Sequence, residues 1–204
     1  MKAGVRGTKE LRQAASWVAS IPTQAQRAAV AAVNRTVVEI RDTATRDMQG
    51  RVNLPADYIR GKLRVVRATA DRPTGVVAIQ RRAIRLARFG AQQLSIASPR
   101  AKGDKLRGIA KGLKQHGISV QVKVARKRLK RAFFLPLMAG TERGGNGMGI
   151  FIRTGPGPKD IEHLWGVSPD QLFRAWRDDN IRMVEGRLAA NFVAELQRTI
   201  KRRG

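Results

Sequence analysis

TQAQRAAVAAVNRTVVEIRDTATRDMQG, residues 23–50, is the stretch that decides the fold of this chain. Its apolar side chains recur at steps of three or four residues, at Ala25, Ala29, Val33, Val37, Ile40, Ala44 and Met48. This spacing puts them on one stripe of an α-helix. Thr23 follows the helix-breaking Pro22 and opens the pattern, and Gly50 can end it. We therefore expect a long helix whose opposite face is charged and solvated.

A second apolar stripe with helical spacing reaches the C-terminus. Ser168-Pro169-Asp170 predicts an N-cap with proline at the first helical position. The stripe consists of Leu172, Phe173, Trp176, Ile181, Val184, Leu188, Phe192, Leu196 and Ile200. Asp178-Asp179 lies within it and indicates either a break between two helical pieces or a salt-bridge site. Two shorter helical segments are predicted at Thr8–Ala19 and Leu54–Ile59.

Between these helices the sequence favours β-structure. Leu63–Thr69 and Gly75–Gln80 are rich in Val and Ile and flank a turn, which predicts a hairpin. Ile118–Val124 alternates apolar and polar residues, as expected for a strand with one buried and one wet face. A further strand is predicted at Ile150–Thr154, after the glycine-rich loop Gly140–Gly149.

These elements predict an α+β fold in a single domain over residues 1–204, long enough to bury one core. Two long amphipathic helices, N- and C-terminal, would pack on one small, mainly antiparallel sheet. The basic segment 98–116 is expected to be a loop insertion that is mobile in isolation, because its lysines alternate with glycines.

Positive charge is concentrated in the middle of the chain. The whole sequence has 41 Lys and Arg against 15 Asp and Glu, a formal net charge of +26. Between Asp71 and Glu142, seventeen Lys and Arg accompany one acid, Asp104. Such self-repulsion is costly unless a polyanion or an acidic partner neutralises it. The candidate nucleic-acid contacts are Arg81, Arg82, Arg85, Arg88, Lys102, Lys105, Arg107, Lys111, Lys114, Arg126, Lys127, Arg128, Lys130 and Arg131.

Any one of these basic runs could equally be a solubilising surface, but three runs in one region favour phosphate binding without base readout. No helix-turn-helix, zinc finger or aromatic-bearing sheet motif is present in the sequence. Aromatic residues are scarce, and Phe89, Phe133 and Phe134 are expected in the core rather than as stacking platforms.

Residues that would support catalysis or metal binding are few. The chain has no cysteine, and its two histidines, His116 and His163, do not stand in a zinc-ligand spacing. Asp160, Glu162 and His163 form the closest catalytic candidate, but no nucleophile accompanies them, so we interpret them as capping and subunit-contact residues. We expect no enzyme activity, cofactor, metal, signal peptide or membrane span.

Seven segments in order resemble the minor tail protein Z family of long-tailed bacteriophages, and together they span most of the chain. They are Ala31–Thr36, Leu63–Thr69, Leu86–Ala91, Gly117–Val122, Ala132-Phe133, Gly149–Arg153 and Ile161–Ser168. The basic insertion, Ser98 to His116, departs from the expected pattern.

The resemblance implies a structural virion protein of the tail or neck that acts in tail completion and head–tail joining, after assembly in the host cytoplasm. It also implies a homo-oligomeric ring, with six copies as the working hypothesis, that meets tail terminator, tail tube or neck proteins. Packaged double-stranded DNA would be contacted through its phosphates. The alternative is a free, sequence-nonspecific nucleic-acid-binding protein.

Overall fold

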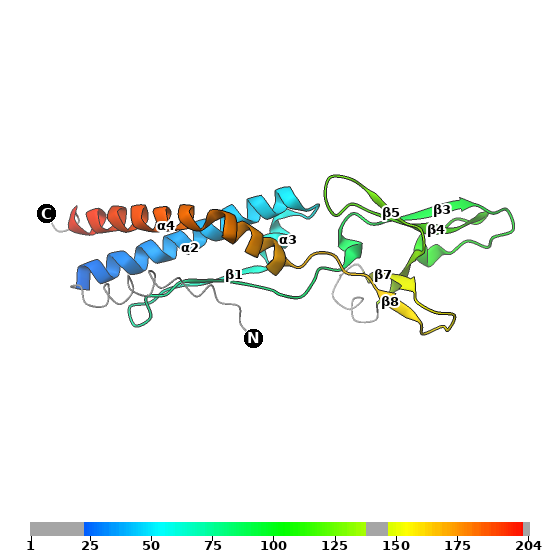
Figure 1. Cartoon of the computed structure of the whole chain (residues 1–204), viewed down its shortest axis with the longest axis horizontal. Helices are drawn as coiled ribbons and strands as arrows, with labels where there is room; N and C mark the ends of the chain where they lie inside the picture. The colour runs from blue at the N-terminus through cyan, green and yellow to red at the C-terminus, as the bar shows by residue number, and fades with distance from the viewer. Residues whose placement is uncertain (1–22, 138–146, 202–204) are drawn as a thin grey trace. The chain divides into compact units, whose positions relative to one another are not determined.

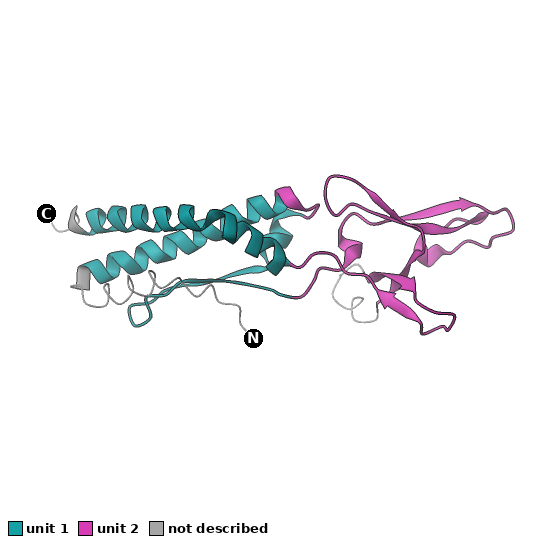
Figure 2. Cartoon of the chain, viewed as in Figure 1, with its two compact units in different colours: residues 1–49, 55–81, 169–204 teal, residues 50–54, 82–168 magenta. Residues whose placement is uncertain are grey.

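The computed structural model describes residues 23–137 and 147–201, which form two compact units (Figures 1 and 2). Unit 1 combines three separate segments, Met1–Gln49, Pro55–Arg81 and Pro169–Gly204. Unit 2 consists of Gly50–Leu54 and Arg82–Ser168. The predicted helix Thr8–Ala19 and most of the glycine-rich loop lie outside the described residues. The expectation that residues 1–204 behave as a single domain stays a prediction.

Unit 1 contains both long helices and the predicted hairpin (Figure 1). Its elements are α2 (Thr23–Arg51), α3 (Ala56–Arg60), β1 (Leu63–Val66), β2 (Val76–Ile79) and α4 (Pro169–Lys201). β1 and β2 pair antiparallel, with Leu63 opposite Ile79. These elements confirm the two long helices, the short helix after Pro55 and the hairpin.

α4 runs without interruption through Asp178 and Asp179. The interpretation of a break at this point is therefore wrong. The salt-bridge alternative is confirmed for Asp178, whose carboxylate lies 2.7 Å from the Arg177 guanidinium. Because this pair is exposed, its effect on stability is small.

The predicted stripe of α2 packs in the core of unit 1. Ala29, Val37, Ala44 and Met48 are buried. A β-carbon at Gly75 would lie 2.7 Å from a methyl group of Val33, so glycine at this position lets the hairpin approach the helix closely. The Asn34 side chain accepts a hydrogen bond from the backbone N–H of Ala68 and donates one to its carbonyl oxygen, at 2.7 and 3.0 Å. The hairpin is thus fixed against α2 by both packing and hydrogen bonds.

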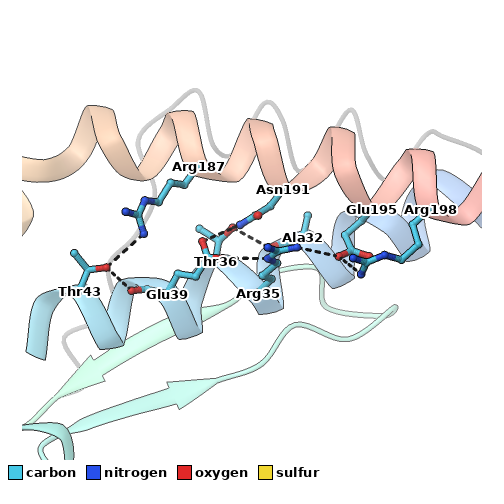
Figure 3. Close-up of polar contacts among 9 residues, drawn as sticks. All are labelled: Ala32, Arg35, Thr36, Glu39, Thr43, Arg187, Asn191, Glu195 and Arg198. Atoms are coloured by element: carbon cyan, nitrogen blue, oxygen red, sulfur yellow. Dashed lines mark hydrogen bonds and ion pairs between the residues drawn. The ribbon is translucent and has the colours of Figure 1, made fainter.

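A polar layer joins α2 to α4 (Figure 3). The buried Asn191 amide donates to Thr36 Oγ1 at 3.0 Å and to Glu39 Oε2 at 3.1 Å. Thr36 in turn donates to the carbonyl oxygen of Ala32, and Arg35 lies 3.8 Å from Glu195. Since a buried amide needs these partners, the layer fixes the register of the two helices.

Unit 2 is built of two three-stranded antiparallel sheets. The first contains β3 (Gln92–Ala97), β4 (Leu113–Val120) and β5 (Lys127–Leu129) in that order. The second contains β6 (Ala132–Pro136), β7 (Met148–Arg153) and β8 (Ile161–His163). The described residues therefore form three small sheets, counting the unit 1 hairpin, and the expectation of one sheet beneath both helices is wrong.

The strand predicted at Ile118–Val124 is shifted in the structure. β4 begins at Leu113 and ends at Val120, and Val124 is 90% exposed. Both Ile118 and Ser119 are buried, so at this point the two sheet faces are both covered, contrary to the expected wet face. The chain leaves the sheet after Val120, where the N–H of Gln121 donates to the carbonyl oxygen of Phe89. β7 confirms the strand predicted at Ile150–Thr154.

Candidate nucleic-acid interface

Unit 2 carries most of the excess positive charge. Its segments contain nineteen Lys and Arg against four Asp and Glu, a net charge of +15. Unit 1 balances twenty-two Lys and Arg with eleven acids, a net charge of +11. Any surface of this chain that neutralises phosphate is therefore expected mainly on unit 2.

The fourteen predicted contact residues all lie in unit 2 except Arg81, which ends the preceding segment of unit 1. Twelve are exposed, and Arg85 and Arg107 are half-buried. The first basic run, residues 81–88, ends in the 3-10 helix η1 (Leu86–Arg88). The second, residues 100–114, occupies the connection between β3 and β4 and the start of β4, and the third, residues 126–131, surrounds β5. Most of these cations are thus accessible to an external anion, and their contact with DNA stays a prediction.

The sheet β3-β4-β5 brings the second and third runs together. Lys114 lies on β4, and Lys127 and Arg128 lie on β5, which pairs directly with β4. Arg126 adjoins the end of the first run, because its guanidinium lies beside Gly90. Three runs that are separate in sequence therefore contribute to one folded unit.

Several of these arginines also have structural roles. Arg126 donates to Ser119 Oγ at 2.7 Å, and Arg128 donates to the carbonyl oxygen of His116 at 3.3 Å. The lysines differ, since within the described residues their side chains make no hydrogen bond or ion pair. They are Lys102, Lys105, Lys111, Lys114, Lys127 and Lys130. These ammonium groups keep their full capacity for an external anion.

The basic insertion 98–116 is not the irregular loop that was expected. Its last four residues form the start of β4, and a 3-10 helix, η2 (Lys105–Arg107), lies at its centre. Asp104 caps η2 by accepting from the N–H of Arg107 at 3.2 Å. The N–H of Ser98 donates to the carbonyl oxygen of Gly112 at 2.8 Å. These hydrogen bonds hold the lysines on a hairpin-like extension of the sheet.

A row of rings crosses the second sheet, a feature that the sequence did not indicate. Phe133, Phe151 and His163 occupy paired positions on β6, β7 and β8, and the His163 ring lies 4.6 Å from that of Phe151. Trp165 continues the row, 4.5 Å from His163. Phe133 is buried, and Trp165 is 39% exposed with the Arg82 guanidinium carbon 5.3 Å from its ring centre, so the row runs from the core of unit 2 to its surface. The prediction that Phe89 and Phe133 are core residues is confirmed, and Phe134 is half-buried.

Comparison with protein families gives one decisive match. The family described as Prophage minor tail protein Z (GPZ) matches residues 8–203, nearly the whole chain. The chain belongs to this family. No curated protein and no solved structure matches it.

Membership makes the chain a structural protein of the phage tail and places it in the virion. The resemblance inferred from seven segments is thereby confirmed. In the described part of this tail protein, no helix is long and apolar enough to cross a membrane.

The three residues of the catalytic candidate, Asp160, Glu162 and His163, do not form a common site in the tail protein. The Asp160 carboxylate accepts from the N–H of Gly157 at 2.8 Å and so closes the turn between β7 and β8. Glu162 and His163 point to opposite faces of β8, because they are consecutive strand residues. The interpretation of Asp160 as a capping residue is confirmed.

Two residues beside the predicted cations were missed. Arg153 and Gln115 line one hollow together with Arg107, Arg131 and Phe133. Arg153 lies outside the three basic runs, and only the β6–β7 pairing brings it near them. The available signal was the pair of apolar runs at residues 132–136 and 148–153, which could have been read as the two strands of a hairpin.

We expect His163 to make the stability of the tail protein depend on pH. Burial, and then the charges of Arg85 and Arg82, lower the pKa of His163 from its ordinary value of 6.5. Its Nε2 atom is buried and has no hydrogen-bond partner among residues 23–137 and 147–201. Well above pH 6.5 the ring is neutral in both the folded and the unfolded state. As the pH falls below this value, the unfolded chain takes up the proton first, so the free energy of unfolding falls.

We expect His163→Phe to reduce this loss while keeping the ring row intact. The measurement is chemical unfolding at about pH 7.5 and about pH 5, with the difference compared between variant and wild type. His116→Phe, at the exposed histidine of β4, is the matched control and should follow the wild type. Equal differences for His163→Phe and the wild type would contradict the assignment.

Proposed function

We propose that this tail protein acts in tail completion and head–tail joining as a homo-oligomeric ring of six copies, whose unit 2 faces DNA. The supporting observation is the net charge of +15 on unit 2, with lysines that bind nothing else in the described residues. A ring of such units around a channel would neutralise the passing genome through its phosphates. It would not read base sequence, so the DNA remains free to slide.

The proposal also names the neighbours of the ring. Tail terminator, tail tube or neck proteins would contact its more balanced surfaces, and DNA the basic ones. A closed ring is the arrangement that a heterologous, head-to-tail interface generates when its rotation closes.

Size and shape measurements of the purified chain, alone and with tail-tube subunits, test the oligomer. Light scattering coupled to gel filtration should give a fixed multiple of the monomer mass, and electron microscopy should show closed rings. A monomer under both conditions would contradict the ring and favour a free nucleic-acid-binding protein.

The DNA-facing assignment is tested with two variants of equal net charge. Lys102, Lys105, Lys111 and Lys114, all replaced by Gln, should lower the slope of log affinity against log salt for duplex DNA by about 3 to 4 units. The matched control replaces four exposed arginines of unit 1 by Gln: Arg27, Arg64, Arg67 and Arg72. The control should keep the wild-type slope. Equal losses in both variants would show that total charge alone determines binding.

A further inference from the structure

A hollow in unit 2 gathers three arginines around one aromatic ring. It is lined by Arg107, Gln115, Arg131, Phe133 and Arg153, and its volume is about 360 Å³. The lining residues come from η2, β4, the turn between β5 and β6, β6, and the end of β7. Only the folded unit brings them together, because Arg107 and Arg153 are far apart in the sequence.

The pairing of β6 with β7 places two of these cations opposite each other. Ala132 lies opposite Ile152 in the ladder, and continuing this register by one residue puts Arg131 opposite Arg153. Phe133 and Phe151 form the next pair on the same face. Like charges at opposed positions of an antiparallel pair destabilise it. An anion between the two guanidinium groups would remove this repulsion.

The protein itself neutralises little of the charge in the hollow. Among the described residues, Asp104 is the one carboxylate that pairs with any of the three arginines, 3.5 Å from Arg107 Nε. Arg153 donates to the carbonyl oxygen of Gly157 at 3.3 Å. Arg131 is exposed and makes no hydrogen bond or ion pair within the described part of the chain. Three guanidinium groups thus face one carboxylate, and most of their donors remain available.

Uncharged neighbours help to orient Arg107 and Arg153. The guanidinium carbons of Arg107 and Arg153 lie 5.8 and 5.7 Å from the centre of the Phe133 ring. Gln115 accepts from Arg107 at 3.4 Å while its amide donates to the carbonyl oxygen of Ala132 at 3.0 Å. Cations held over a ring and by a side-chain amide lose less conformational entropy when an anion binds.

We propose that this hollow binds one phosphate group. A carboxylate has two oxygens in one plane and is satisfied by a single guanidinium fork. A phosphate presents oxygens in several directions, which matches donors that approach from η2, from the β5–β6 turn and from β7. The inference rests on the proposed function only for the source of the phosphate, which is either the DNA backbone or a free phosphate compound.

Binding of inorganic phosphate to the full chain tests the site directly. Isothermal titration at constant ionic strength, with chloride as the balancing anion, should show saturable binding by the wild type. Arg131→Gln and Arg153→Gln should each weaken this binding by about 10- to 100-fold, since each removes charged hydrogen bonds. Lys130→Gln is the matched control, because Lys130 is adjacent in sequence, exposed and absent from the lining. It should bind phosphate as the wild type does.

Three outcomes would overturn the phosphate site. They are the absence of saturable binding in the wild type, an equal loss in Lys130→Gln, and tighter binding of a glutamate-rich peptide that the same arginine variants abolish. Unchanged circular dichroism of the variants excludes misfolding as the cause of any loss.

A second titration, with a short DNA duplex, identifies the source. If Arg131→Gln and Arg153→Gln weaken duplex binding more than Lys130→Gln does, the phosphate belongs to DNA. If the two arginine variants lose binding of inorganic phosphate but keep binding of the duplex, the phosphate site is supported and its ligand is a free phosphate compound. Because rings and lysine-dependent DNA binding are measured separately, failure of the site is distinguishable from failure of the proposed function.

Discussion

Trp176→Ala is expected to lower the free energy of unfolding by roughly 3–5 kcal/mol, as large-to-small substitutions of buried aromatic residues do. Trp176 lies on α4, is 2% exposed, and stacks on the buried Phe173 with ring centres 5.5 Å apart. α4 contacts β2, and the β1–β2 hairpin is held to α2, so the lost side chain leaves a cavity within the core of unit 1. The structure around the deleted side chain can relax only partly, so the remaining cavity adds an unfavourable free energy to the lost transfer free energy. Urea unfolding followed by far-UV circular dichroism measures the effect.

Trp165→Ala is the matched control for this prediction. Trp165 is 39% exposed and contacts His163 and Arg82 at the end of the ring row. Its removal should cost clearly less, because most of the exposed ring was never transferred from water. Equal costs for the two substitutions would contradict the assignment of Trp176 to a tightly packed core.

The same variant tests the predicted single domain. If residues 1–204 unfold as one cooperative unit, Trp176→Ala shifts the only transition. If units 1 and 2 unfold separately, it shifts one transition, and a second keeps its wild-type midpoint. The sequence could not decide this, because unit 1 is assembled from three discontinuous segments.

Long periodic segments were predictable from the sequence. The stripe from Ala29 to Met48 repeats often enough to indicate a helix without tertiary information, and the structure confirms it over 29 residues. The β1–β2 hairpin was predictable for a related reason, since two apolar runs flank a turn. In both cases the side chains of the segment itself determine which face is buried.

Short strands and the sites built from them were not predictable. β5 consists of Lys127, Arg128 and Leu129 and forms only because β4 offers an edge to pair with. β8 has three residues and likewise depends on β7. Where pairing rather than periodicity determines the structure, a single sequence carries little signal. The arginine hollow follows from such pairing, because Arg131 and Arg153 meet only through the β6–β7 register.

The second large effect is expected at Phe89, a fully buried side chain of unit 2. The backbone of Phe89 links two parts of this unit, since its N–H donates to the carbonyl oxygen of Leu86 and its carbonyl oxygen accepts from Gln121. Phe89→Ala should cost roughly 3–5 kcal/mol in the free energy of unfolding, because a cavity replaces the ring. The measurement is again urea unfolding by far-UV circular dichroism.

Gly166 shows how closely this ring is packed, and it gives the prediction a second test. A β-carbon at Gly166 would lie 2.9 Å from Cζ of Phe89 and closer still to Cε2. Gly166→Ala alone should therefore cost about 1–3 kcal/mol by overpacking. In the Phe89→Ala background the added methyl group enters the cavity, so the two costs should not add.

Gly186→Ala is the control for this double-mutant cycle, because beyond the backbone of its own helix a β-carbon there meets no atom of the described residues within 4 Å. It lies inside α4, where alanine is favoured over glycine by about 0.5–1 kcal/mol, and its small gain should add to the cost of Phe89→Ala unchanged. Additive costs for Phe89→Ala and Gly166→Ala would show that the ring does not occupy the space beside Gly166. A double variant that costs about 0.5–3 kcal/mol less than the sum of the two single variants would establish the contact between Phe89 and Gly166 as one that holds unit 2 together.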